Sequence, residues 1–313
     1  MDKEPEISIV VPIYNCDKFL RGCLQSVLDQ TFDSYEVLMV NNRSTDSSEQ
    51  IAREFDKKDS RFRLIQCKSG LAGSTRNIGI HAARGKYLAF LDGDDKLLPD
   101  YMKKLHSAAE KYHADIVVCG FYIYYLNKEK RRKSGRIPHV AVYDNIEAMK
   151  ELLRDRYMRF YLWNKLWKRT LFSETGIEIP DMYYEDAAVC PQLFSHAEKV
   201  VMIDDCLYEY MRYNSAVMEI NMGPQRINDY INTIPIIRLF LEDQGNYKTV
   251  ERSFQKHISH VVLSLPLLCI QSKRDLNDGV LKNASRGIKK AFKCSKMPAN
   301  ELKHLEIRSD TVR

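Results

Sequence analysis

The chain has 313 residues, of which 44% are hydrophobic and 29% are charged, with only 13 glycines and 10 prolines. This composition excludes disordered, collagen-like and fibrous proteins and predicts a soluble globular protein of one large or two modest domains. Residues 271–313 hold 11 Lys and Arg against 5 Asp and Glu, which accounts for the whole net charge of +6 and disfavours a nucleic-acid binder.

The first hundred residues alternate short apolar runs with segments of helical periodicity. The apolar runs predict strands at residues 7–11, 36–40, 62–67 and 87–91, and the periodic segments predict helices at about 19–28, 47–57 and 74–83. Asp46 and Glu49 predict a capping box at the start of the second helix. Because strands separated by single helices require crossovers, we predict an α/β fold with a mostly parallel, Rossmann-like sheet and helices on both faces.

The pattern after the fourth strand is less regular. We interpret residues 128–136 (KEKRRKSGR) as a solvated basic turn between strands. From about residue 223 onward, the spacing of apolar residues is helical throughout. We therefore predict a helical C-terminal region after the α/β unit.

The cysteines and the apolar runs indicate a cytoplasmic protein. The eight cysteines show no CxxC spacing, so we expect reduced and mostly buried thiols. The first residues, MDKEPE, lack the basic and long apolar parts of a signal peptide. The later run from Val261 to Ile270 is about half of the roughly 20 residues that a membrane span needs.

Acidic residues follow the fourth strand, where Asp92, Asp94 and Asp95 surround Gly93. Ligands of open parallel sheets bind beyond the carboxyl ends of the strands. Clustered carboxylates repel one another unless a cation or a buried proton relieves them, and such hard oxygen ligands suit Mn²⁺ or Mg²⁺ with diphosphate oxygens. Taken alone, the motif also fits a solvated turn before Pro99, which is a more common use of Asp.

Four motifs occur in a fixed order along the chain. They are VPIYN ending at Asn15, NNRSTD ending at Asp46, TRNIG ending at Gly79 and YLAFLDGDD ending at Asp95. In this order and spacing they resemble the family-two GT-A nucleotide-sugar glycosyltransferases, an inverting, bacterial-type group. The resemblance covers residues 5–125 strongly and continues loosely through segments 163–167, 184–186 and 208–215.

The resemblance implies a GT-A fold and an activity. The expected reaction is inverting, metal-dependent transfer of a sugar from a nucleotide-diphosphate sugar, with UDP-sugar favoured, to a hydroxyl of a glycan, a cell-wall polymer or a lipid-linked acceptor. Residues 1–222 would form the GT-A catalytic domain, with a nucleotide-binding half at about 5–125 and an acceptor half at about 126–222. Residues 223–313 would form a helical C-terminal region with a basic tail.

The resemblance also implies which residues hold the donor. Pro12, Tyr14 and Asn15 would line the base and ribose, and Arg76 would reach the nucleotide. Asp92 would bind the ribose or the metal. Asp94 would bind the Mn²⁺ or Mg²⁺ ion that bridges the diphosphate and neutralises charge on the leaving group.

Asp186 is the implied general base for the acceptor hydroxyl. The adjacent Glu185 would raise the pKa of one carboxyl, which suits a base working near neutral pH. The same pair also fits the acidic start of a helix. Lys165 and Arg212 are candidate contacts to phosphate or acceptor. Trp163 is a candidate sugar platform, although its spacing from Trp167 also fits a core position.

The nucleotide loop departs from the family pattern. Relatives usually carry an acidic residue followed by Gly and Ser where this chain has Asn42-Arg43-Ser44. Asn42 still offers a carbonyl oxygen to the N–H of uracil, but without the charge. Three explanations remain open, namely weaker uridine binding, a different base such as cytosine, and loss of catalytic use.

Because both acidic motifs are retained, we favour a working enzyme with a UDP-sugar donor. A non-catalytic nucleotide-binding subunit with the same fold is a second hypothesis. Metal-dependent nucleotidyl transfer ranks last, because it does not explain the pair at 185 and 186. The cations of residues 271–313 suit transient contact with the cytoplasmic face of an anionic membrane, and equally suit an ordinary solvated surface.

Overall fold

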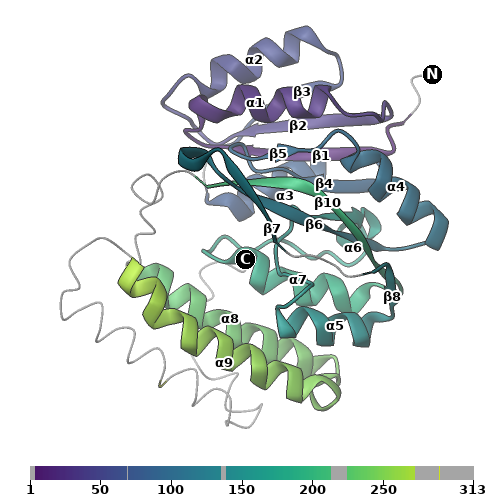
Figure 1. Ribbon diagram of the computed structural model, residues 1–313, viewed down its shortest axis with the longest axis vertical. Helices are drawn as coiled ribbons and strands as arrows, with labels where there is room; N and C mark the ends of the chain where they lie inside the picture. The colour runs from purple at the N-terminus through teal and green to yellow at the C-terminus, as the bar shows by residue number, and fades with distance from the viewer. Residues whose placement is uncertain (1–3, 69, 135–138, 213–223, 272–288, 290–313) are drawn as a thin grey trace.

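The computed structural model describes residues 4–68, 70–134, 139–212, 224–271 and 289 (Figure 1). The first part alternates strands with helices, in the order β1 (Ile7–Ile13), α1 (Asp17–Leu28), β2 (Tyr35–Asn41), α2 (Ser48–Lys58), β3 (Phe62–Gln66), α3 (Ala72–Ala82), β4 (Tyr87–Phe90), β5 (Lys96–Leu97) and α4 (Tyr101–Tyr112). Each strand and helix predicted in this part is present, with its ends shifted by two residues at most.

The remaining elements are more varied. They are β6 (Ile116–Tyr125), the 3-10 turn η1 (Leu126–Lys128), β7 (Lys130–Ser134), β8 (Ala141–Tyr143), α5 (Asn145–Arg154), β9 (Lys165–Lys168), α6 (Thr170–Ser173), α7 (Glu185–His196), β10 (Val200–Arg212), α8 (Pro224–Asp243) and α9 (Tyr247–Gln271). The helical pattern predicted from about residue 223 is thus present as α8 and α9. The basic tail lies almost entirely outside the described residues.

The strands form one mixed sheet in the order β3-β2-β1-β4-β9-β6-β10-β5. β1 pairs in parallel with β2 and β4, β2 pairs in parallel with β3, and β6 pairs in parallel with β10. β9 lies between β4 and β6 and is antiparallel to both, so β4 and β6 run in the same direction. The predicted α/β fold is confirmed, and the carboxyl ends of β1, β2, β4, β6 and β10 meet at one edge.

Helices cover both faces of the sheet, as predicted. Buried residues of α1, α2 and α4 share one apolar core with the strands. Buried residues of α3, α5, α7, α8 and α9 form the core on the other face, and Figure 1 shows α5, α7, α8 and α9 below the sheet. Four of the predicted buried thiols lie inside these cores, namely Cys23, Cys67, Cys119 and Cys190. None of the described helices combines the length and apolarity that a bilayer span requires.

Two local predictions are wrong. The basic segment is not a turn, because Lys130–Ser134 forms strand β7 and pairs antiparallel with β6. The backbone of this segment completes a ladder with β6 while the cationic side chains stay in water. The capping box at α2 is also absent. Ser47 is the N-cap, and Asp46 instead accepts the N–H groups of Ser48 and Asp17, each at 3.0 Å, while Glu49 bonds Arg53.

α3 lies unusually close to β1. A Cβ atom added at Gly79 would lie 2.4 Å from Cγ1 of Val10, so only glycine permits this approach. The contact sets the depth of the helix whose first turns reach the carboxyl edge of the sheet.

We expect the substitution Gly79→Ala to lower the free energy of unfolding by about 2 kcal/mol because it overpacks the α3–β1 contact. A helical Gly→Ala change without that contact would instead stabilise the protein by about 1 kcal/mol. Urea denaturation of both single variants and of Val10→Ala/Gly79→Ala tests the cause. The double variant should lose less stability than the two single losses together, and full additivity would contradict the steric explanation.

Candidate functional site

A cleft of about 750 Å³ opens at the carboxyl edge of the sheet. It lies where β1, β2 and β4 end and α3 begins. Seven residues expected from the sequence line it, namely Pro12, Tyr14, Asn15, Asn42, Arg76, Asp92 and Asp94. The edge rule for parallel sheets therefore locates the cleft correctly.

The loops after β1 and β2 support each other. The Asn15 Oδ1 atom accepts the N–H of Thr45 at 2.8 Å, and the Asn15 N–H donates to Ser44 Oγ at 3.2 Å. Asn15 has φ 46° and Arg43 has φ 53°. Asn tolerates this left-handed conformation, whereas Arg does so at a cost. Arg43 thus keeps a backbone shape that favours glycine, the residue of the family pattern at this position.

The amide of Asn42 has a defined orientation. Its Nδ2 atom donates to the carbonyl oxygen of Gly70 at 2.8 Å. Its Oδ1 atom is buried and has no hydrogen-bond partner among the described residues. Since a buried polar atom without a partner costs free energy, Oδ1 is the group at this position that gains most from a donor.

Arg76 joins the acidic motif to α7. The guanidinium donates from Nη2 to Asp92 Oδ1 at 2.7 Å and from Nη1 to Glu185 Oε1 at 2.5 Å. Its side chain is only 8% exposed. Burial alone would lower the pKa of Arg76, but the charges of Asp92 and Glu185 outweigh burial and raise it. Arg76 is therefore a fixed cation that links segments 109 residues apart.

The three carboxylates after β4 have different environments. Asp95 is buried and accepts the hydroxyl of Tyr208 at 2.7 Å and the N–H of Met211 at 2.8 Å, so it holds β10. Asp92 and Asp94 line the cleft. Burial and the charge of Asp92 raise the pKa of Asp94 to about 6. Repulsion of this kind is what a divalent cation relieves, so the donor set fits Mn²⁺ or Mg²⁺.

Glu185 and Asp186 occupy the first turn of α7, after Tyr184 at φ 62°. Burial and the charge of Glu185 raise the pKa of Asp186 to about 7, against the opposing effect of Arg76. The Asp186 Oδ1 atom also accepts its neighbour's N–H, that of Ala187, at 2.8 Å. The pair is thus a helix start and, at the same time, a carboxyl poised near neutral pH.

Lys165 does not line the cleft, so the structure gives no support to its predicted contact with phosphate or acceptor. The side chain is fully buried at the start of β9. Its Nζ atom donates to the carbonyl oxygens of Arg159, at 2.6 Å, and Tyr161, and to Asn164 Oδ1 at 2.9 Å. Burial lowers the pKa of Lys165 to about 8. The preceding loop folds back over this amine and accepts a hydrogen bond from each of its three N–H groups.

Trp163 and Arg212 also lie outside the cleft. Trp163 is 6% exposed and stacks on the rings of Tyr161, at 4.7 Å, and Tyr208, at 4.2 Å. It is therefore a core residue rather than an open sugar platform. Arg212 is exposed at the end of β10 and does not line the cleft.

The structure adds cleft residues that no motif indicated. Arg226, in the first turns of α8, lines the cleft and lies 4.5 Å from the ring of Tyr183. Asp229 of the same helix accepts the N–H of Tyr183 at 3.1 Å. A cation of the helical C-terminal region thus faces the proposed diphosphate site, although the motifs do not extend to it.

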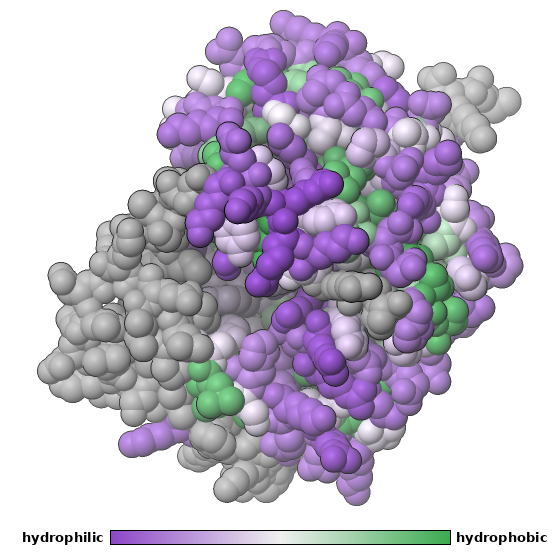
Figure 2. Space-filling model, viewed as in Figure 1, coloured by the Kyte–Doolittle hydropathy of each residue, from purple (hydrophilic) through white to green (hydrophobic). Residues whose placement is uncertain are grey.

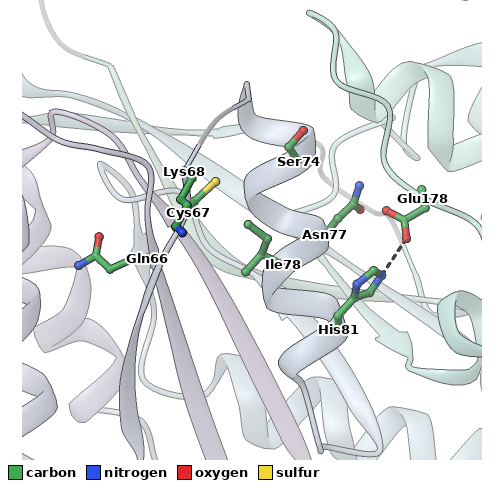
Figure 3. A pocket seen from close by; sticks show the side chains of 8 residues that line it. All are labelled: Gln66, Cys67, Lys68, Ser74, Asn77, Ile78, His81 and Glu178. Carbon is green, nitrogen blue, oxygen red and sulfur yellow. Dashed lines mark hydrogen bonds and ion pairs between the residues drawn. The ribbon is translucent and has the colours of Figure 1, made fainter. Parts of the chain in front are cut away.

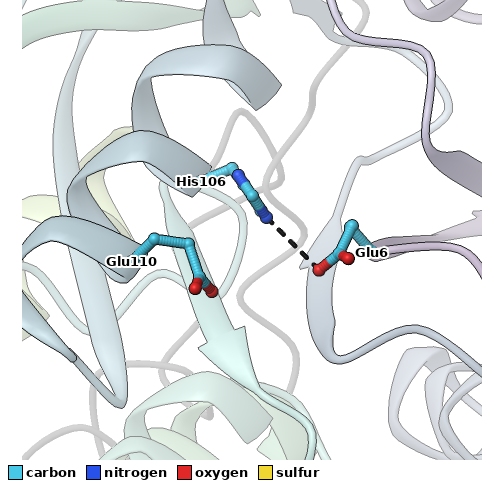
Figure 4. A group of neighbouring side chains, drawn as sticks. All are labelled: Glu6, His106 and Glu110. Atoms are coloured by element: carbon cyan, nitrogen blue, oxygen red, sulfur yellow. Dashed lines mark hydrogen bonds and ion pairs between the residues drawn. The ribbon is translucent and has the colours of Figure 1, made fainter.

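Two other polar groups lie apart from this cleft. An open hollow of about 460 Å³ beside β3 and α3 carries His81 and Glu178, whose ring Nε2 and Oε1 atoms are 2.7 Å apart (Figure 3). Glu6, His106 and Glu110 cluster near the amino end of β1 (Figure 4). Glu110 is already bonded by Lys86 and Tyr87. Neither group continues the acidic motif.

Comparison with known proteins gives consistent results. The model of the family described as "Glycosyl transferase family 2" matches residues 8–190. The chain is 34% identical over 228 residues to the uncharacterized glycosyltransferase EpsJ of Bacillus subtilis (strain 168), which covers 70% of this chain and 65% of EpsJ. The chain spans 30% to 65% of the lengths of EpsJ and the next two curated relatives.

Solved structures share the fold at low identity. The first 349 residues of Staphylococcus aureus TarS, in complex with UDP-GlcNAc, match with a TM-score of 0.59 and 16% identity over 93% of this chain and 90% of that one. The mannosyltransferase PcManGT of Pyrobaculum calidifontis, in complex with GDP-Man and Mn²⁺, matches with a TM-score of 0.57 and 13% identity over 96% and 79%. Both support the GT-A fold.

The raised pKa of Asp94 predicts a dependence of stability on pH. The folded chain holds this proton more tightly than the unfolded chain, so its ionisation costs stability as pH rises from about 4 to about 6. We expect Asp94→Asn to raise the free energy of unfolding by about 2 kcal/mol at pH 8 and to change it little at pH 4. Urea denaturation at the two pH values tests this, and an equal effect at both would contradict it.

Proposed function

Because the chain belongs to glycosyl transferase family 2, we propose that it is an inverting, metal-dependent glycosyltransferase. It moves a sugar from a UDP-sugar to a hydroxyl of a glycan, a cell-wall polymer or a lipid-linked acceptor. The observation that carries the proposal is the double ion pair of Arg76, which joins Asp92 of the cleft to Glu185 beside Asp186. The candidate metal motif and the candidate base are thereby tied into one unit.

Asp92 and Asp94 are the proposed ligands of a Mn²⁺ or Mg²⁺ ion. Of the two carboxylate oxygens of Asp92, Arg76 bonds Oδ1, and burial together with the charge of Asp92 raises the pKa of Asp94. Such a cation, when bound, neutralises charge on the leaving diphosphate. The Mn²⁺ in the PcManGT complex supports this assignment. Arg226 would add a fixed positive charge at the same cleft.

Asp186 is the proposed general base. Glu185 is paired with Arg76, and burial together with the charge of Glu185 raises the pKa of Asp186 to about 7. A carboxylate with such a pKa takes the proton of an acceptor hydroxyl while that oxygen attacks the anomeric carbon. Attack opposite the diphosphate gives inversion. The adjacent carboxylates of Glu185 and Asp186 thus have different proposed roles, because the guanidinium of Arg76 pairs with Glu185.

Uridine is the proposed nucleoside because of the Asn42 amide. Its nitrogen donates to Gly70, so its buried oxygen is the acceptor that remains and would accept from a base. Uracil presents a ring N–H at N3, whereas cytosine presents an acceptor there. Pro12, Tyr14 and Asn15 would line the base and ribose. The UDP-GlcNAc in the TarS complex supports a uridine donor.

Hydrolysis of UDP-sugars with Mn²⁺ tests catalysis. We expect wild-type turnover to fall by at least 100-fold in Asp94→Asn and in Asp186→Asn, because the first removes a proposed metal ligand and the second the proposed base. The rate of the wild type should rise with pH and level off above about 7, since Asp186 must lose its proton. Chelation of the metal should abolish it.

The variant Asp204→Asn, on the exposed part of β10, is the matched control and should keep its rate. Nucleotide binding that needs no metal and leads to no turnover would instead favour the non-catalytic subunit.

Calorimetry tests the assignment of the base. We expect Asn42→Ala to weaken UDP binding about tenfold and CDP binding much less, because the lost oxygen is proposed to accept from uracil. Pyrophosphate with Mn²⁺ should bind both proteins equally, which separates the base from the diphosphate. Tighter binding of CDP or GDP than of UDP by the wild type would overturn the assignment.

A further inference from the structure

A hairpin made of β6, η1 and β7 carries a concentrated positive charge. Residues 128–133 contain five cations and one acid, Glu129. All six are exposed, and the cations are Lys128, Lys130, Arg131, Arg132 and Lys133. Figure 2 shows strongly hydrophilic side chains gathered over the region of β7. Residues 1–270 carry no net charge as a whole. The hairpin of β6, η1 and β7, which we name the basic hairpin, nevertheless has a local excess of positive charge.

The basic hairpin lies at an edge of the sheet. Among the described strands, β7 pairs only with β6, through the register Phe121↔Ser134 to Tyr125↔Lys130. β6 runs in the same direction as β1 and β4, so its turn projects from the carboxyl edge where the cleft opens. The hairpin turn and the cleft mouth therefore face the same side of the molecule.

Most of this charge is left to solvent. Within the described part of the chain, one cation of the hairpin forms an ion pair, namely Arg131 with Glu209 at 3.3 Å. The Arg131 guanidinium also lies 4.6 Å from the ring centre of Tyr122. Lys130, Arg132 and Lys133 project from the strand without an acidic partner among the described residues. Cations arranged this way attract a dense array of anions.

An apolar residue lies at the turn of the basic hairpin. Leu126 is 46% exposed and lies two residues before the cationic run. Tyr124 and Tyr125 end the strand before it and are partly exposed. Leucine and tyrosine flanked by Lys and Arg are typical of segments that enter the boundary between lipid headgroups and acyl chains.

We propose that the basic hairpin docks on an anionic lipid bilayer. The cations would bind headgroup phosphates, and Leu126 would enter the interface. A polyanion in solution, such as a nucleic acid, would use the cations but would gain nothing from an exposed leucine at the turn. Docking would turn the cleft mouth toward the bilayer, and if the proposed function holds with a lipid-linked acceptor, that substrate would be held there. The docking itself does not depend on which sugar is transferred.

Sedimentation of the full chain with vesicles tests the proposal. The probes are vesicles of phosphatidylcholine with about 30% phosphatidylglycerol, whose surface potential is roughly −30 to −50 mV, and vesicles of phosphatidylcholine alone. We expect binding to the anionic vesicles only. In the variant Lys130→Gln/Arg131→Gln/Arg132→Gln/Lys133→Gln, binding should fall roughly 100-fold, because three cations without an ion pair each contribute about fivefold. Leu126→Ala should give a smaller loss.

Two variants with the same change in net charge serve as controls. Lys57, Lys58, Lys103 and Lys111, all exposed on α2 and α4, are changed to Gln in the first. Lys289, Lys290, Lys293 and Lys296 of the basic tail are changed to Gln in the second. The first control should bind vesicles like the wild type. Thermal unfolding should show that every variant remains folded.

The proposal fails if the hairpin variant binds anionic vesicles like the wild type, or if only the tail variant loses binding. It also fails if the wild type binds inorganic polyphosphate in solution but neither kind of vesicle, since the partner would then be a polyanion. Hydrolysis of UDP-sugar by the hairpin variant should equal that of the wild type. This readout separates failure of docking from failure of the proposed enzyme activity.

Discussion

One buried cation organises the candidate site. Arg76 lies between Asp92 and Glu185 with its guanidinium removed from water, so each of the three charges needs the others. Removing one partner of such a cluster leaves an uncompensated buried charge, which is strongly destabilising. The close contact of Gly79 with Val10 sets how closely α3 packs on the sheet. The start of α7 must then lie near α3, because Glu185 pairs with Arg76. The packing of the helices on the sheet therefore determines where the charges of the cleft lie.

A second buried cation supports the other half of the site. Lys165 holds the loop of residues 159–164 in place through hydrogen bonds. The ring of Trp163 in this loop stacks on the ring of Tyr208. Tyr208 in turn donates to Asp95 of the acidic motif. The loop before β9 is thus connected through side chains to the carboxylates after β4. The polar groups of this network hold the structure together, which leaves Asp92, Asp94 and Asp186 for the proposed chemistry.

The sequence predicted the alternation of elements in the first hundred residues and the cleft at the ends of β1, β2 and β4. These features depend on local periodicity and on the direction of strands, both of which a single sequence contains. The role of Lys165 could not be predicted, because its ammonium becomes structural only when the backbone of residues 159–161 folds back over it. For Trp163, the core position was one of the two alternatives that the sequence left open. Arg226 was missed for a related reason, since only tertiary packing brings α8 to the cleft. The strand β7 was missed because its charges resemble those of a solvated turn, while its pairing depends on β6.

The position of β9 has a consequence for synthesis of the chain on the ribosome. β9 lies between β4 and β6 in the sheet, although it follows both in sequence. Until residue 168 has emerged, β6 has no neighbour that connects it to β4, and each of these strands exposes an unpaired edge. After β6 has been made, more than 40 further residues must be translated before β9 is complete. During this time the unpaired edges of β4 and β6 must not pair with strands of other chains. β9, which is made after both of its neighbours, joins the β4 part of the sheet to the β6 part.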